Sequence, residues 1–108
     1  MKFNDVNAVF SSIPQIFDPK AAGDMEAIFQ FNITGEGGGN WNLTIKNGTC
    51  EVREGSHEFP TVTLIMDSDV WLAMVKREIN GMQAFMSGKL NVRGDIILAQ
   101  KIPDLFPF

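Results

Sequence analysis

The chain has 108 residues, of which 44% are hydrophobic and 20% charged, and its formal net charge is −4. This length fits one domain, and the composition is that of a folded globular protein rather than a disordered tail. The excess of acidic residues is unlike the basic surface of a nucleic-acid-binding protein. It also argues against strong attraction to anionic membranes, although the sequence still allows a local basic patch. No apolar run approaches the ~20 residues that a membrane span needs.

Cys50 is the only cysteine in the sequence, which excludes an internal disulfide and suits a reducing compartment. The first residues carry a charge but no continuous apolar stretch, unlike a secretory signal. We therefore expect a cytoplasmic protein that makes at most transient contact with membranes. We expect it to be a monomer or a weak dimer.

An amphipathic helix is predicted at the start of the chain. Apolar residues recur at three- and four-residue steps from Phe3 to Ile13, and Pro14 limits how far the helix continues undisturbed. Residues 18–23 have the composition of a loop.

A three-stranded meander is predicted next. Apolar and polar side chains alternate with period two, so each strand has one buried and one polar face. A glycine-rich turn at 35–39 separates the first two strands, and Asn47-Gly48 favours a tight hairpin before the third. The three strands are residues 25–34, 41–45 and 50–53.

The second half of the chain alternates short strands and short helices. Asp67 or Ser68 is the expected N-cap of its first helix, Asn80 that of the second, and Gly88 ends the second. The predicted order is a strand at 61–66, a helix at 70–77, a short helix at 80–88, a short strand at 90–92 and a helix at 96–102. Pro103 and Pro107 then bracket an apolar tail.

This layout predicts an α+β fold with two layers, in a single domain that spans residues 1–108. Because at least three strands are polar on one face, we expect that face of the sheet to be solvated. All helices should then pack on the other face.

Several segments resemble the sterol carrier protein 2 (SCP-2) sterol and lipid-binding domain family in their order and spacing. They are Ile28-Phe29-Gln30-Phe31, Trp41, Lys46-Asn47-Gly48, Leu64 to Asp69, Ala84 to Leu90, and Val92-Arg93-Gly94-Asp95. The resemblance covers nearly the whole chain. It implies a mixed five-stranded sheet with helices packed on one face, enclosing an apolar cavity for fatty acids, acyl-CoAs and sterol-like lipids.

The C-terminus departs from the peroxisomal members of this family, which end in a Ser-Lys-Leu-type address. This chain ends in Leu105-Phe106-Pro107-Phe108, so a free-standing domain without that address is the simplest interpretation. The apolar tail either docks reversibly over the cavity as a lid or completes the core permanently, and the sequence leaves both alternatives open.

No set of residues has the spacing of a catalytic or metal site. His57 is the only histidine and has no obvious partner, and Cys50 has no adjacent base or second cysteine. Capping of a helix explains Asp67 and Asp69, and the glycine-rich turn joins two strands and lacks the features of a phosphate loop. We therefore expect no enzymatic activity, no metal and no cofactor.

Ten apolar residues on or beside the helices of the second half are candidates for the lipid pocket. From sequence alone such residues more often form the core, and only the family resemblance favours a ligand role for some of them. Lys20 is a candidate anchor for a polar headgroup, although a solvated loop lysine is the simpler explanation. The ten candidates are Trp71, Met74, Met82, Phe85, Met86, Leu90, Ile96, Ile102, Leu105 and Phe106.

The sequence leaves three function classes open. The first is a carrier that binds and transfers lipids without making bonds. The second is a lipid-presenting or substrate-shielding subunit of a partner enzyme, as the resemblance to fused family domains suggests. The third is an enzyme whose site the sequence does not reveal.

Overall fold

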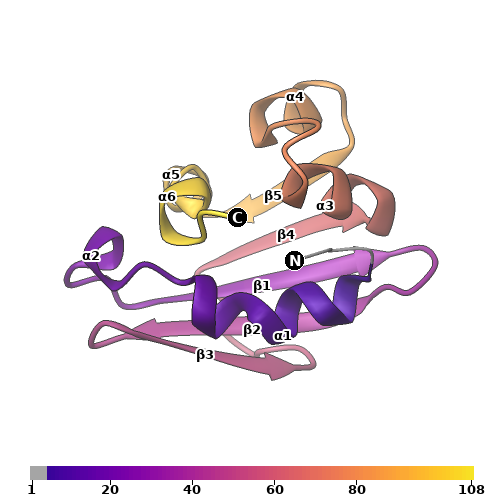
Figure 1. The fold of residues 1–108 in the computed structure, drawn as a ribbon. Coiled ribbons are helices and arrows are strands. Elements are labelled where there is room, and N and C mark those ends of the chain that lie inside the picture. Colours follow the sequence, from indigo (N-terminus) through magenta and orange to yellow (C-terminus); the bar gives the residue numbers. More distant parts are fainter. Residues whose placement is uncertain (1–4) are drawn as a thin grey trace.

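The computed structural model describes residues 5–108 and shows a five-stranded mixed sheet with its helices on one face (Figure 1). This confirms the predicted α+β fold. The helices are α1 (Val6–Ile16), α2 (Pro19–Ala22), α3 (Ser68–Val75), α4 (Gly81–Met86), α5 (Ile96–Ala99) and α6 (Ile102–Leu105). The strands are β1 (Ala27–Thr34), β2 (Gly39–Lys46), β3 (Thr49–Glu54), β4 (Val62–Asp67) and β5 (Leu90–Gly94).

The strand order across the sheet is β3-β2-β1-β4-β5. Strands β1, β2 and β3 form the predicted antiparallel meander, β4 pairs parallel to β1, and β5 pairs antiparallel to β4. The β2–β3 hairpin has positive φ at both turn residues, 54° at Asn47 and 71° at Gly48. This conformation suits asparagine and glycine and matches the right-handed twist of the strands, which confirms the predicted hairpin.

The core lies between the sheet and the helical layer. Phe10 of α1 stacks on Trp41 of β2 with ring centroids 4.4 Å apart, and its ring lies 5.2 Å from that of Trp71 in α3. Asp5 caps α1 by accepting the backbone N–H of Asn7 at 2.8 Å. Phe3, which the sequence places on this helix, lies outside the described residues. Aromatic stacking therefore joins the first helix to both the sheet and the second half of the chain.

The opposite face of the sheet is partly covered, which corrects the expectation that it is solvated. The β3–β4 connection must cross β2 and β1 to reach the far side of the sheet. Gln30 is 3% exposed and Asn42 5% exposed beneath it. Their side-chain amides donate to the Gly55 carbonyl at 3.2 and 3.1 Å, and Gln30 Oε1 accepts the His57 N–H at 2.8 Å. These polar residues hold the crossing segment rather than facing water.

Two segments differ from the sequence-based expectation. The predicted loop at 18–23 contains the one-turn helix α2, because Asp18 caps it and Pro19 occupies its first turn. The predicted helix at 96–102 is divided into α5 and α6. Pro103 has no backbone N–H and is favoured in the first turn of a helix, where it begins α6 instead of continuing α5.

Candidate functional site

The inward face of three neighbouring strands forms the floor of a pocket under the helical layer. Leu64 and Met66 of β4 pair in register with Val92 and Leu90 of β5, and Phe31 of β1 pairs with Leu64. Period-two alternation places these five side chains on one face of the sheet, and all five line the pocket. The floor is therefore apolar throughout.

The helices supply the walls of this larger pocket, whose volume is about 490 Å³. Trp71 and Met74 come from α3, Met82 and Phe85 from α4, and Ile96 from α5. The last three are also exposed to solvent, so the pocket opens between α4 and α5. Sites for small molecules commonly measure roughly 300–1,000 Å³. The remaining lining residues are Asn80, Gly81, Ala99, Gln100, Ile102 and Pro103.

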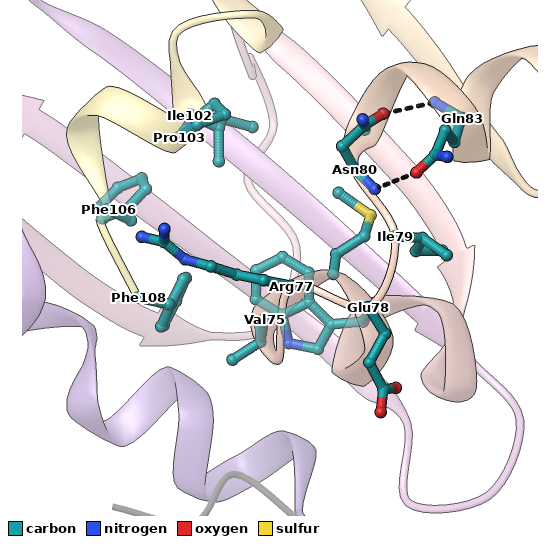
Figure 2. Close-up of a pocket in the computed structure, with 13 residues that line it drawn as sticks. Val75, Arg77, Glu78, Ile79, Asn80, Gln83, Ile102, Pro103, Phe106 and Phe108 are labelled. Carbon is teal, nitrogen blue, oxygen red and sulfur yellow. Dashed lines mark hydrogen bonds between the residues drawn. The ribbon is translucent and has the colours of Figure 1, made fainter.

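Side-chain caps fix the short helices that form the walls. Asn80 Oδ1 accepts the Gln83 N–H at 2.8 Å, and Gln83 Oε1 accepts the Asn80 N–H at 2.9 Å, as Figure 2 shows. This reciprocal capping box confirms Asn80 as the predicted N-cap of α4. Asp95 caps α5 by accepting the Leu98 N–H at 3.0 Å. Helices this short depend on such caps and on packing for their stability.

A second pocket of about 450 Å³ adjoins the first, and the two share Trp71, Met74 and Ile102 among their lining residues. Figure 2 shows the Arg77 side chain extending across this second pocket toward Phe106 and Phe108. The φ angle of Arg77 is 62°, in the left-handed region that usually favours glycine at a helix end. The second pocket is the more polar of the two, because Arg77, Glu78, Asn80 and Gln83 line it.

Trp71 forms part of the wall between the two pockets. Its ring lies 5.1 Å from that of Phe31 and 6.1 Å from that of Phe108. Within residues 5–108, its indole Nε1–H is the one buried side-chain donor or acceptor that lacks a hydrogen-bond partner. An unsatisfied buried donor costs about 1–3 kcal/mol, so the contribution of Trp71 to stability comes from packing.

The C-terminal tail is anchored in the core. Leu105 is fully buried and its carbonyl accepts the Asp18 N–H at 2.8 Å. Phe106 packs against Phe17 and Phe29, with ring centroids 5.9 and 6.5 Å away. Phe108 is only half-buried. Of the two alternatives for the tail, a lid or a permanent part of the core, the structure therefore shows packing in the core for the residues up to Phe106.

The structure brings seven of the ten candidate pocket residues together around the larger pocket. Phe106 lines only the second pocket, Leu105 packs inside the core, and Met86 projects into solvent with 79% of its surface exposed. The seven are Trp71, Met74, Met82, Phe85, Leu90, Ile96 and Ile102. The sequence-based candidates omitted the floor residues Phe31, Leu64, Met66 and Val92. Their place in the period-two pattern of each strand puts them on the inward face of the sheet and was a signal that could have identified them.

The polar candidates lie away from both pockets. Lys20 belongs to α2 and lines neither pocket. His57 Nδ1 accepts the Phe59 N–H at 2.9 Å within the crossing loop, which gives the ring a structural role. Cys50 is on the inward side of the edge strand β3, where burial raises the pKa of its thiol to about 12. A thiol with so high a pKa is a poor nucleophile near neutral pH.

The described residues offer neither a metal site nor a membrane-spanning helix. No group of three or more His, Cys, Asp or Glu residues between positions 5 and 108 is arranged to hold a metal ion. In the same part of the chain, no helix has the length and apolar character needed to cross a bilayer.

An apolar pocket between a mixed sheet and a single helical layer defines a small lipid-binding domain. A model of the SCP-2 sterol transfer family matches residues 11–107. The chain therefore belongs to the SCP-2 sterol transfer family, which confirms the resemblance seen in its sequence motifs.

Known relatives include parts of longer proteins. Hydroxysteroid dehydrogenase-like protein 2 of Xenopus tropicalis is 36% identical over 94 residues, which cover 86% of this chain and 22% of that protein. The chain thus spans about a fifth of the length of this curated relative.

Solved structures share the fold. Palmitated SCP2L2 from Aedes aegypti is 25% identical with a TM-score of 0.71, and the match covers 92% of this chain and 87% of that one. The stereoselective inverting sec-alkylsulfatase Pisa1 from Pseudomonas sp. is 18% identical with a TM-score of 0.81, and the match covers 91% of this chain and 16% of that one. The likeness to the sulfatase concerns the fold alone.

Proposed function

We propose that the chain is a non-enzymatic carrier that binds the apolar part of a lipid in the larger pocket and releases it unchanged. The observation that carries this proposal is a pocket of about 490 Å³ with an apolar floor and an opening between α4 and α5. The proposed ligands are fatty acids, acyl-CoAs and sterol-like molecules. The palmitated state of the Aedes aegypti relative supports an acyl chain as one of them.

Burial of methylene groups supplies enough free energy for such binding. A long acyl chain has on the order of 15 methylenes, each contributing about 0.8 kcal/mol when it leaves water. The gross gain of roughly 12 kcal/mol is reduced by an association cost of at least ~4 kcal/mol. The remainder corresponds to a micromolar or somewhat tighter dissociation constant.

The composition of the walls supports binding without chemistry and with low selectivity. Besides the indole N–H of Trp71, the polar side chains that line the larger pocket are the uncharged amides of Asn80 and Gln100. None of these three groups is a nucleophile or a general base at neutral pH. Because the driving force follows buried area rather than specific polar contacts, chains of similar length should bind with similar affinity.

A pocket-filling substitution tests the proposal. Ala99→Phe places a ring in the larger pocket and should weaken palmitate binding at least about tenfold, or about 1.4 kcal/mol. Val92→Phe on the floor is a second variant in case the first fails to fold. Ala21→Phe on exposed α2 adds the same ring away from the pocket and should leave binding unchanged.

Isothermal titration with palmitate measures the affinities, and native mass spectrometry of the purified protein detects co-purified lipid. Unchanged affinity in both folded pocket variants would contradict the proposal.

The second candidate function is lipid presentation to a partner enzyme. The observation that favours it is that the relative in Xenopus tropicalis carries the similar segment within a much longer chain. A partner enzyme that binds this domain in a fixed stoichiometry and loses turnover of a lipid substrate with the Ala99→Phe variant would support this role. A domain that transfers lipid between vesicles without any partner would favour the carrier.

A further inference from the structure

Two short helices beside the pocket opening expose large apolar side chains. Met82, Phe85 and Met86 of α4 and Ile96 and Ile97 of α5 are between 45% and 79% exposed. We call these five residues the α4–α5 patch. Met82, Phe85 and Ile96 also line the larger pocket, whereas Met86 and Ile97 line neither pocket. The patch is therefore more than the inner lining of a ligand site, because its outer members face solvent only.

The charges of the chain are distributed unevenly with respect to this patch. Residues 76–108 carry five Lys and Arg against three Asp and Glu, a net charge of +2, whereas residues 1–75 carry four against ten, a net charge of −6. Lys89 lies three residues after the end of α4 and Lys101 two residues after the end of α5, and both are exposed. Although the whole chain is acidic, residues 76–108, which contain the α4–α5 patch, therefore carry a net positive charge.

We propose that the α4–α5 patch is the surface with which this protein docks on an anionic lipid bilayer, with the pocket opening toward the membrane. Apolar side chains of this kind enter the boundary between headgroups and acyl chains, while nearby lysines are attracted to anionic headgroups. At physiological salt the Debye length is about 8 Å, so acidic groups on remote parts of the molecule are largely screened from the membrane surface.

The geometry links docking to the proposed function, on which this part of the inference rests. A lipid that leaves the bilayer through the opening between α4 and α5 passes over Met82, Phe85 and Ile96 directly into the larger pocket. Its acyl chain then never enters bulk water. This avoids the unfavourable free energy of hydrating the whole chain during transfer. Docking itself requires only the outer surface of the patch, so the two functions are experimentally separable.

A double substitution at the outer members of the patch tests docking. Met86→Ser combined with Ile97→Ser should weaken binding to vesicles of phosphatidylcholine and phosphatidylserine, mixed roughly three to one, by at least about tenfold in a sedimentation assay. The matched control is Phe59→Ser, because Phe59 is as exposed as Met86, at 79%, but lies in the β3–β4 connection. The control should bind vesicles like the wild type.

Charge reversal tests the choice of an anionic bilayer. Lys89→Glu with Lys101→Glu should abolish the preference for phosphatidylserine, whereas Lys46→Glu in the β2–β3 hairpin should preserve it. Raising the salt to about 1 M, where the Debye length is about 3 Å, should weaken wild-type binding to anionic vesicles.

Palmitate titration separates this inference from the proposed function. The Met86→Ser/Ile97→Ser variant should retain wild-type palmitate affinity, since neither residue lines a pocket. Wild-type protein that binds palmitate but ignores anionic vesicles would overturn the docking proposal alone, as would equal binding to pure phosphatidylcholine vesicles. Sedimentation equilibrium showing a dimer that the double substitution dissociates, without vesicle binding, would assign the patch to a protein interface instead.

Discussion

The ring of Phe108 meets the indole of Trp71 edge-on, with ring centroids 6.1 Å apart and ring planes at 90°. Two residues earlier, Phe106 is only 2% exposed and packs against the core. The tail thus consists of an anchored part and a half-buried end that covers the wall of the second pocket. Any movement of the tail as a lid is confined to the residues after Phe106.

Removing the ring of Phe106 should destabilise the whole domain. Phe106→Ala leaves a cavity among Phe17 and Phe29, and deletions of this size cost about 3–5 kcal/mol in the free energy of unfolding. Urea denaturation followed by the fluorescence of the two tryptophans measures the change. A loss below about 1 kcal/mol would show that the anchored part of the tail is loosely packed.

Removing the ring of Phe108 should act on ligand exchange more than on stability. Phe108→Ala exposes one edge of Trp71, and we expect release of a fluorescent fatty acid to be several-fold faster while the loss in stability stays near 1 kcal/mol. Stopped-flow mixing with acceptor vesicles gives the rate. Unchanged exchange in the folded variant would show that the end of the tail is not a lid.

The hydrogen bonds beneath the crossing loop should contribute measurably to stability. Gln30→Ala removes the acceptor of the His57 N–H and one of the donors to the Gly55 carbonyl, which should cost about 1–3 kcal/mol. Asn40→Ala on the same sheet alters an exposed amide and serves as the control. Thermal unfolding measures the stability of both variants. A loss for Gln30→Ala alone supports a stabilising hydrogen-bond network, whereas no loss in either variant would show that these hydrogen bonds contribute little.

The cysteine and the histidine should be dispensable for lipid binding. Cys50→Ser combined with His57→Ala touches neither pocket, so palmitate affinity should remain within about tenfold of the wild type, or about 1.4 kcal/mol. Titration of the folded double variant provides the measurement. A greater loss would reveal a role for one of them that the geometry does not suggest.

The raised pKa of Cys50 should produce a pH dependence at the alkaline end. Its folded-state pKa of about 12 exceeds the ordinary value of 9.0, so the unfolded chain releases this proton first as the pH rises. The stability contribution of the neutral thiol is therefore complete below about pH 9 and declines between about 9 and 12. Unfolding free energies of the wild type and Cys50→Ser, measured across this range, should diverge accordingly, and parallel profiles would contradict the shift.

The sequence alone determined the elements whose signals are local. Alternation with period two predicted β1 and β2, Asn47-Gly48 predicted the hairpin, and Asn80 predicted the start of α4, because each signal depends on residues a few positions apart. The break between α5 and α6 escaped prediction, although Pro103 marked the position at which a continuous helix becomes unfavourable.

Only the tertiary structure decided which apolar residues face a pocket and which polar residues are buried. Leu105 and Ile102 look alike in the sequence, yet one fills the core and the other lines both pockets. Gln30 and Asn42 have the pattern of a solvated face, but a loop that crosses the sheet buries them. Periodicity specifies the face of a helix or strand on which a side chain lies. Burial depends on what packs against that face, and distant segments of the chain supply those packing partners.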